Sequence, residues 1–360
     1  MTRTRTLLAT LAAATALSAV SVPAAYAQQD TAEACFVYVG SRTDGGWSQA
    51  HDLARMAVEE HFGGAVTTTY VENVPEANSE GTIERLARSG CDIIFTTSFG
   101  FMEPTIAVAE RFPDVLFEHA TGYMTAPNVS VYNSRFYEGR YIQGQIAASI
   151  SETGQAGYIG SFPIPEVVQG INAFILGAQS INPDFSLRVV WVNSWFDPAG
   201  EADAARVLMD QGVDIITQHT DSTAPMQEAE ARGIKAFGQA SDMIEAGPNA
   251  QLTAIVDTWA PYYIERVQAV LDGTWETSDR WDGLAEGILT MAPYTNMPED
   301  VAALAEATEA AIIAGELHPF TGPINRQDGS VWLAEGEIAD DGTLLGLNFY
   351  VEGVDDQLPE

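Results

Sequence analysis

The chain has 360 residues, of which 50 are acidic and 16 are basic, and its formal net charge at pH 7 is -34. This excess of acids argues against nucleic acid as a partner, because phosphate neutralisation requires basic patches. The length exceeds the size at which one hydrophobic core usually stops growing, so we expect two domains. Lys235 is the only lysine, and such an acidic surface favours a salty environment in which the charges are screened.

Residues 1–27 have the pattern of a secretory signal peptide. Arginines at positions 3 and 5 precede an apolar run over residues 7–20, and a small-x-small cleavage site ends at Ala27. The apolar run is shorter than the ~20 residues of a membrane span. We therefore expect the mature chain to begin near Gln28 and to reside in the periplasm.

The first structural unit is expected over residues 35–55, which read CFVYVGSRTDGGWSQAHDLAR. An apolar run is followed by a polar turn and then by an Ala- and Leu-rich helical pattern. The turn contains Trp47, and Asp44 is the expected helix cap. A helix over 81–89 and a strand over 91–97 follow.

The two cysteines, Cys35 and Cys91, each lie at the start of a predicted strand. The first and third strands of a doubly wound sheet are neighbours. In an oxidising compartment the two sulfurs are therefore candidates for a disulfide, and two buried free thiols are the alternative.

Polar residues stand near the ends of the next two predicted strands. The strand over 115–120 contains Glu118 and His119, and the strand from 129 leads into Asn133, where we expect the chain to leave the first lobe. Ligands of open parallel sheets lie at the carboxyl ends of the strands. Glu118 and Asn133 are therefore predicted to face a ligand.

A second copy of the plan begins further along the chain. Residues 188–206 are again expected to form a strand, a turn with Trp195 and a helix capped by Asp197. The segment GVDIITQHT, which begins at Gly212, is similar to GCDIIFTTS, which begins at Gly90. An internal repeat of this kind predicts two similar α/β lobes with parallel sheets. The two tryptophans would then face each other across a cleft.

The lobe boundaries follow from the predicted crossings of the chain. We assign residues 30–133 plus 257–290 to the N-terminal lobe and residues 134–256 plus 291–360 to the C-terminal lobe. Three crossings make a hinge rather than a loose tether.

Signatures of catalysis and of metal binding are weak. HExxH, Walker and GxGxxG motifs are absent, and TTSFG over residues 96–100 lacks the first glycine of a nucleophile elbow. The five histidines do not have metal-ligand spacing, although His119 and His219 stand at matching strand ends. We expect no catalytic residue, no metal and no cofactor.

Aromatic and polar residues at strand ends together predict the ligand. Planar side chains offer stacking faces to a flat ring, while acids and an amide exchange hydrogen bonds with its edge. Carboxylates would repel a phosphate. We therefore expect an uncharged heteroaromatic base or its nucleoside to contact these residues: Trp47, Phe99, Glu118, Asn133, Trp195, Asp221, Asp242 and Trp259.

Several segments resemble the basic membrane protein family, the purine-nucleoside receptors of ABC importers, and more closely its adenine-binding branch. They include GGWSQAHDLAR, FTTSFGFMEPT, NSRFYEGRYIQG, WVNSWFDP and KAFGQASDM. The resemblance implies a type I periplasmic binding fold with three hinge strands and a purine held between Trp47 and Trp195. Ser48 and Gly100, in the first two segments, are expected to border the ligand. Nucleoside-binding members commonly have phenylalanine at these two positions and a lysine in the later hinge region. This chain has tryptophans there and no hinge lysine, so a free base is favoured.

The expected partners are a purine base and an ABC permease, and the expected state is a monomer. Alternative functions are a purine nucleoside receptor, a sugar receptor, and an extracytoplasmic nucleoside hydrolase with Asp221 and Asp242 as its acid pair. A sensor that delivers ligand to a chemoreceptor would use the same site.

Overall fold

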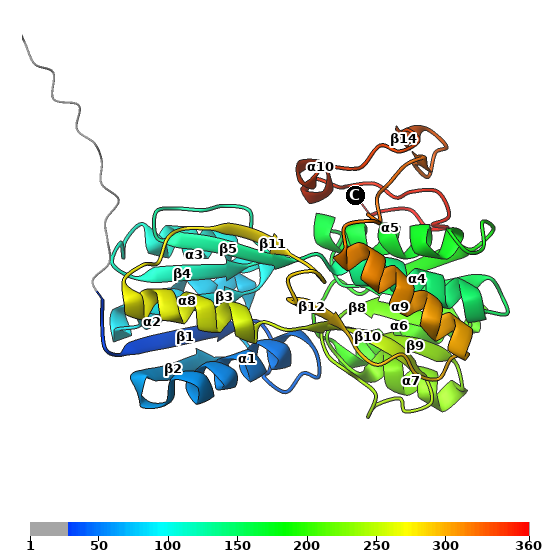
Figure 1. Cartoon of the computed structure of the whole chain (residues 1–360). Coiled ribbons are helices and arrows are strands. Elements are labelled where there is room, and N and C mark those ends of the chain that lie inside the picture. Colours follow the sequence, from blue (N-terminus) through cyan, green and yellow to red (C-terminus); the bar gives the residue numbers. More distant parts are fainter. Residues whose placement is uncertain (1–27, 360) are drawn as a thin grey trace, which may run out of the picture.

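The computed structural model describes residues 28–359, and the expected signal peptide lies outside this range. Two lobes lie side by side, and each is built around a six-stranded sheet (Figure 1). Within residues 28–359, no helix is both long and apolar enough to cross a bilayer. The fold is α/β with two mainly parallel sheets, as the duplicated pattern predicts.

The N-terminal lobe contains a parallel sheet with the strand order β11-β5-β4-β3-β1-β2. Its strands are β1 Ala32–Tyr38, β2 Val66–Val71, β3 Ile93–Thr97, β4 Leu116–Ala120, β5 Val129–Ser134 and β11 Asp279–Asp282. Its helices are α1 Trp47–Phe62, α2 Ser79–Ser89, α3 Met102–Ala109 and α8 Ala260–Asp272, with 3-10 helices η1 Gly63–Ala65, η2 Glu76–Asn78 and η3 Phe99–Phe101. Helices α1 and α8 cover one face, and α2 and α3 cover the other.

The alternation of side chains along β1 explains why both faces are covered. Ala34, Phe36 and Tyr38 join the core beneath α1 and α8, whereas Cys35 and Val37 join the core beneath α2 and α3. Successive side chains of a strand point to opposite faces, so a continuous apolar run must be buried on both sides. This is why the strand reads as one hydrophobic block in the sequence.

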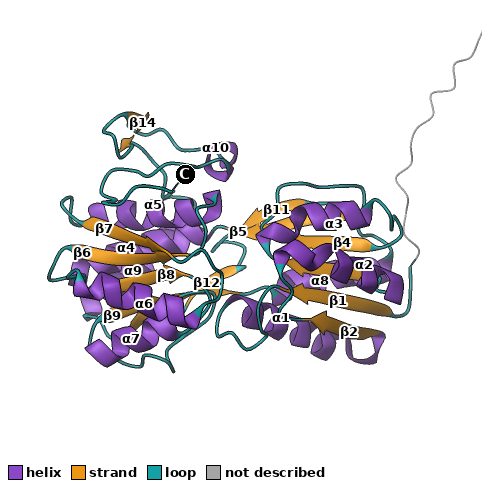
Figure 2. Cartoon of the chain, turned by 180° about the vertical axis from the view of Figure 1, so that it is seen from behind, coloured by secondary structure: helices purple, strands orange, loops and turns teal. Residues whose placement is uncertain are grey.

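The C-terminal lobe contains a sheet with the order β12-β10-β9-β8-β6-β7, in which only β12 is antiparallel. Its strands are β6 Gln155–Gly160, β7 Ser186–Trp191, β8 Ile215–His219, β9 Lys235–Gly238, β10 Gln251–Asp257 and β12 Leu289–Met291. Its helices are α4 Phe136–Ile150, α5 Pro165–Gln179, α6 Pro198–Asp210, α7 Ala224–Arg232 and α9 Glu299–Ile313. Figure 2 shows α6 and α7 on the face opposite α4 and α9.

The remainder of the chain forms a small cap on α5. Strands β13 Ile324–Asn325 and β14 Val331–Leu333 pair antiparallel, and α10 Asp341–Leu345 follows. Gln169 and Asn172 of α5 donate hydrogen bonds to the carbonyls of Leu344 and Phe349. The cap is therefore attached to the C-terminal lobe.

The chain passes between the two sheets three times: between β5 and α4, between β10 and α8, and between β11 and β12. Because β12 pairs with β10, Leu289 and Thr290 belong to the C-terminal sheet. We propose the same two lobes with the third boundary before Leu289, two residues earlier than expected from the sequence.

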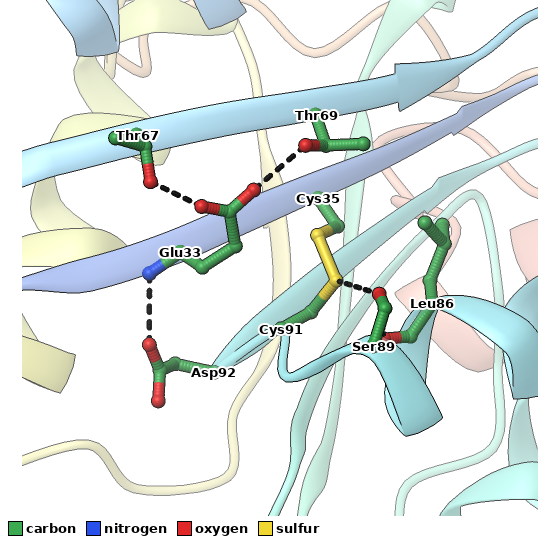
Figure 3. The surroundings of a disulfide bond; sticks show 8 residues. All are labelled: Glu33, Cys35, Thr67, Thr69, Leu86, Ser89, Cys91 and Asp92. Atoms are coloured by element: carbon green, nitrogen blue, oxygen red, sulfur yellow. Dashed lines mark hydrogen bonds between the residues drawn. A yellow bond between two sulfur atoms is a disulfide. The ribbon is translucent and has the colours of Figure 1, made fainter.

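Cys35 and Cys91 are joined by a disulfide, with their Cα atoms 6.0 Å apart (Figure 3). Strand β1 begins at Ala32, so Cys35 lies within this strand and not at its start. Cys91 lies just before β3. The bond therefore connects neighbouring strands near the start of β3, whereas the residues that face the other lobe follow the end of β3.

Candidate functional site

A cleft lies where the carboxyl ends of the strands of both lobes converge. It contains about 330 Å³ of empty space, part of which is open to solvent. The side chains that line it come from both lobes: Val39, Trp47, Ser98, Phe99, Thr121, Glu166, Trp195, His219, Asp221 and Gln239. Four of the predicted site residues, Trp47, Phe99, Trp195 and Asp221, thus meet in one place.

Trp47 is the first residue of α1, and the surrounding turn fixes its position. The Asp44 carboxylate accepts hydrogen bonds from the backbone N–H groups of Ser48 and Gln49, as expected for a helix cap. The indole Nε1 of Trp47 donates to the Thr97 carbonyl at 2.7 Å. One face of a well-held aromatic ring is therefore available to the cleft.

Ser48 is fully buried behind this ring and does not line the cleft. Its Oγ accepts a hydrogen bond from the backbone N–H of Gly40 at 3.2 Å. This hydrogen bond connects the turn after β1 to the first turn of α1.

Trp195 stands on the loop that follows β7. Phe162 packs against its ring at 5.1 Å between centroids, and its carbonyl accepts a hydrogen bond from the backbone N–H of Asp221. Its indole Nε1 donates across the cleft to Oε1 of Glu76 at 3.2 Å. Sequence analysis missed Glu76, because it lies in a polar loop without any local pattern that marks an acid as functional.

Gly100, next to Phe99 in the sequence, contacts the Glu76 carboxylate. Its backbone N–H donates to Oε1 of Glu76 at 3.0 Å. A Cβ atom at position 100 would lie 2.4 Å from Cδ of Glu76, so only glycine allows the carboxylate to approach. Gly100 is therefore placed next to the cleft without lining it.

Asp221 is the most buried acid of the cleft, with 4% of its surface exposed. Burial raises its pKa well above the usual value, and the nearby carboxylates of Asp44, Glu201 and Asp257 raise it further. A ligand that supplies hydrogen bonds would compensate for this buried group.

Glu166 and His219 form a second polar pair that sequence analysis did not assign to the ligand. Nε2 of His219 lies 3.5 Å from Oε1 of Glu166, and Oε2 of Glu166 is buried without a partner among the described residues. Burial lowers the pKa of His219, although Glu166 opposes the shift. The pair therefore presents an unused acceptor next to Asp221 in the cleft lining.

Arg140 is buried and contacts the cleft-lining residue Gln239. Its guanidinium donates to the Gln218 carbonyl at 2.6 Å, to Oγ1 of Thr217 at 3.2 Å, and to the side chain of Gln239. Both carboxylate oxygens of nearby Asp257 are buried without a hydrogen-bond partner in the described part of the chain. Burial raises the pKa of Asp257, Glu166 raises it further, and Arg140 opposes the shift.

Glu118 is not brought to the cleft. It is fully buried, and its carboxylate accepts hydrogen bonds from Nε of Arg266 at 2.6 Å, from Nε1 of Trp275 at 2.7 Å and from the Tyr262 hydroxyl at 2.5 Å. Because Tyr262 and Arg266 belong to α8, the side chain connects β4 to that helix. Burial raises the pKa of Glu118, and the charge of Arg266 opposes this rise.

Asp242 and Trp259 line a different hollow, between α1 and the segment after β9. Asp242 is exposed, and its Oδ1 accepts hydrogen bonds from Gln251 Nε2 and from the Ile244 N–H. Trp259 is buried and stacks on His51 at 5.0 Å between ring centroids. The expectation that both face the same ligand as Trp195 is therefore not met by their positions.

Asn133 lies next to the cleft rather than in it. It lines an adjoining hollow that shares Phe99, Thr121 and Glu166 with the cleft. Its Oδ1 accepts a hydrogen bond from the backbone N–H of Ser134 at 2.7 Å. Its side-chain amide nitrogen therefore remains the group that would face a ligand extending into this hollow.

Metal binding has no candidate site in the described residues, where no group of three or more His, Cys, Asp or Glu side chains is placed to hold an ion. The chemistry of the cleft is that of aromatic faces and carboxylate acceptors. Such a lining offers stacking faces to a flat ring and hydrogen-bond acceptors to N–H donors.

Comparison with known proteins agrees with this geometry. The chain is 65% identical over 326 residues to a purine-binding protein of Brucella abortus, covering 90% of this chain and 93% of that protein. It is 38% identical to a Haloferax volcanii protein, TsgA13, whose name assigns it glucose binding in an ABC transporter only provisionally, covering 92% and 82%.

Among solved structures, an ABC transporter solute-binding protein from Aeropyrum pernix has a TM-score of 0.71 at 19% identity, covering 87% of this chain and 95% of that one, and supports the fold alone. Residues 31–319 match the Bmp family model, described as ABC transporter substrate-binding protein PnrA-like. The chain therefore belongs to the Bmp family of PnrA-like ABC transporter substrate-binding proteins.

Proposed function

We propose that this protein captures a purine base, with adenine favoured, between its two lobes. The observation that carries the proposal is the meeting of Trp47, Phe99 and Trp195 in one cleft. Aromatic side chains offer faces on which a flat base stacks, and each such contact is worth roughly 1 to 3 kcal/mol. We expect one ligand per chain, because these three rings border the same cleft.

The polar lining supports an N–H-rich and uncharged ligand. Oε2 of Glu166 is a buried acceptor without a hydrogen bond among the described residues, and the Asp221 side chain lines the same cleft. The lining residues contain no Lys or Arg to neutralise a phosphate. The exocyclic amino group of adenine can donate to these oxygens, which is why adenine is favoured.

The wider role follows from the family and from the relative in Brucella abortus, which is named as purine-binding. We propose that the protein is exported by its first 27 residues and acts in the periplasm as a monomer. The liganded form then delivers the base to the permease of an ABC importer. A chemoreceptor would use the same cleft.

The test is native mass spectrometry of protein purified without refolding, followed by calorimetry with adenine, hypoxanthine, guanine and adenosine. We expect a retained purine mass, one site per chain, and tighter binding of adenine than of the other three. Adenosine binding as tightly as adenine would show that the cleft accepts a ribose.

Glucose is the decisive competitor, because the Haloferax volcanii relative is named for it. A sugar also stacks on tryptophan, but its rim of hydroxyls requires several polar partners. Calorimetry with glucose should give no heat of binding. Saturable glucose binding without any response to a purine would replace the proposed function by that of a sugar receptor.

A further inference from the structure

The Glu76 carboxylate joins the two lobes at the mouth of the cleft. Its Oε1 accepts hydrogen bonds from Ser98 Oγ at 2.6 Å and from the Gly100 N–H at 3.0 Å, both in its own lobe. The same oxygen accepts a third hydrogen bond, at 3.2 Å, from the indole Nε1 of Trp195 in the other lobe. One side chain thus connects the loop after β3 to the aromatic wall of the cleft.

The N-terminal lobe holds this carboxylate in place independently of Trp195. Glu76 begins η2, and its carboxylate packs directly over Gly100, where an added Cβ atom would lie 2.4 to 2.7 Å from Cδ, Oε2 and Oε1. Ser98 and Gly100 then fix its orientation by their hydrogen bonds. The acceptor is therefore preorganised, which lowers the entropic cost of binding the indole.

The indole N–H of Trp195 is bonded to the opposite lobe. Its ring is half-buried and packs against Phe162 and the adjoining core, and within the described residues the recorded hydrogen-bond acceptor of the indole Nε1 is Glu76. The ring borders the cleft on one side and an outer hollow on the other, and Glu76 lines that outer hollow. The indole thus separates the space for the ligand from the opening to solvent.

We infer that Glu76 is a positioning residue for ligand capture: by accepting the Trp195 N–H across the mouth, it holds the ring over the bound ligand and slows ligand release. The inference rests on the proposed function, because the ligand is taken to be a purine in this cleft. Glu76 itself does not line the cleft. Its removal should therefore change the dissociation rate more than the association rate.

The experiment is a double-mutant cycle with Glu76→Ala, Trp195→Phe and their combination, measured by stopped-flow dissociation of adenine. Trp195→Phe keeps an aromatic ring and lacks the N–H donor. Glu76→Ala should speed dissociation roughly tenfold in the parent, as expected for a lost hydrogen bond to a charged group. On the Trp195→Phe background it should have less than about a twofold effect.

Two further variants separate the contact from a general structural effect. Glu76→Gln keeps an acceptor oxygen and should restore most of the slow dissociation. Glu72→Ala is the matched control, since the Glu72 carboxylate accepts from Ser41 and Arg42 within its own lobe and does not reach across the cleft. It should leave dissociation unchanged. An equal effect of Glu76→Ala in the parent and on the Trp195→Phe background would overturn the inference.

A ligand-free readout distinguishes failure of this inference from failure of the proposed function. The indole N–H resonance of Trp195, identified by its absence in Trp195→Phe, should move in Glu76→Ala and stay in place in Glu72→Ala. If the parent binds no purine, the proposed function fails, while the resonance still decides whether Glu76 holds Trp195. An unmoved resonance in Glu76→Ala would overturn the inference.

Discussion

At the scale of single residues, Trp195 combines a stacking face with a hydrogen-bond donor, and the two can be separated by substitution. The face borders the cleft, while the N–H points to Glu76. The Trp195 ring is only half-buried at the margin of the core, and part of its loop is exposed. Substitutions here should report on binding rather than on folding.

We predict that Trp195→Ala weakens the binding of every purine by about 1 to 3 kcal/mol, because it removes a stacking face. Trp195→Phe should keep most of the stacking energy. Calorimetry gives the affinities, and thermal melting checks that both variants are folded. If Trp195→Ala binds purines as tightly as the parent but melts at a much lower temperature, the side chain belongs to the core and not to the site.

Asp221→Asn should change the selectivity between bases. It replaces one acceptor oxygen by a donor of the same shape, and an unpaired buried group typically costs ~1 to 3 kcal/mol. The loss should therefore be larger for adenine than for hypoxanthine. Asp242→Asn is the matched control, since Asp242 is exposed and lies outside the cleft. Equal losses for both bases in Asp221→Asn would remove Asp221 from base recognition.

Asp257→Asn should make the ligand-free protein more stable at high pH. The folded protein raises the pKa of Asp257, so it binds a proton more tightly than the unfolded chain, whose Asp pKa is ~3.9. The contribution of this group to stability is therefore lost as the pH rises from that value. The melting temperature of the variant should exceed that of the parent at pH 8, and the difference should shrink towards pH 4. A difference that is constant with pH would show that Asp257 titrates normally.

At the scale of elements, the duplication extends to unusual backbone conformations. Gly90 and Gly212 precede the matching strands β3 and β8, and both have a φ of 100°. Thr121 after β4 and Ala240 after β9 have φ values of 61° and 60°, which non-glycine residues rarely adopt. The matching turns thus have the same backbone geometry with different side chains. Strained backbone of this kind is often found at functional sites.

The disulfide is an element-scale constraint that should affect stability without affecting the ligand. It closes a loop with a sequence separation of 56 residues. A double substitution of Cys35 and Cys91 by Ala should lower the free energy of unfolding by about 2 to 4 kcal/mol, as measured by denaturant titration. Adenine affinity should be unchanged, because Cys91 precedes β3 and the cleft residues follow it. Two reactive thiols in unfolded, unreduced parent protein would show that the bond does not form.

At the scale of the whole molecule, the lobes touch at several points around the cleft. Besides the Glu76 contact, the Ser241 hydroxyl donates to the Gly45 carbonyl, and a Cβ atom at Gly46 would lie 2.6 Å from the Asp221 carbonyl oxygen. Each of these contacts would be lost if the lobes rotated apart about the three crossings. Opening would therefore break these polar contacts between the lobes.

We predict that adenine shifts the protein towards the closed arrangement, because only that arrangement brings both tryptophans to one ligand. Small-angle scattering should show a smaller radius of gyration with saturating adenine than without it. Glucose serves as the control and should leave the radius unchanged. The same radius with and without adenine would contradict closure and indicate a rigid site.

Local sequence patterns were sufficient to predict the α/β fold with two parallel sheets and the positions of Trp47 and Trp195 after matching strands. Both follow from local patterns: parallel strands buried on two faces read as apolar blocks, and the repeat puts the same strand, turn and helix in each lobe. The neighbouring positions of β1 and β3, and with them the proximity of the two cysteines, follow from the same strand order.

Which acids line the cleft depends on long-range packing. Glu118 stands near a strand end like Asp221, but it pairs with Arg266, 148 residues away, while Asp242 is held by Gln251. Glu76 lies in a loop and meets Trp195 across 119 residues of sequence. The direction of a side chain at a strand end is set by the partner that packs against it, and when that partner comes from a distant segment no local pattern can reveal it.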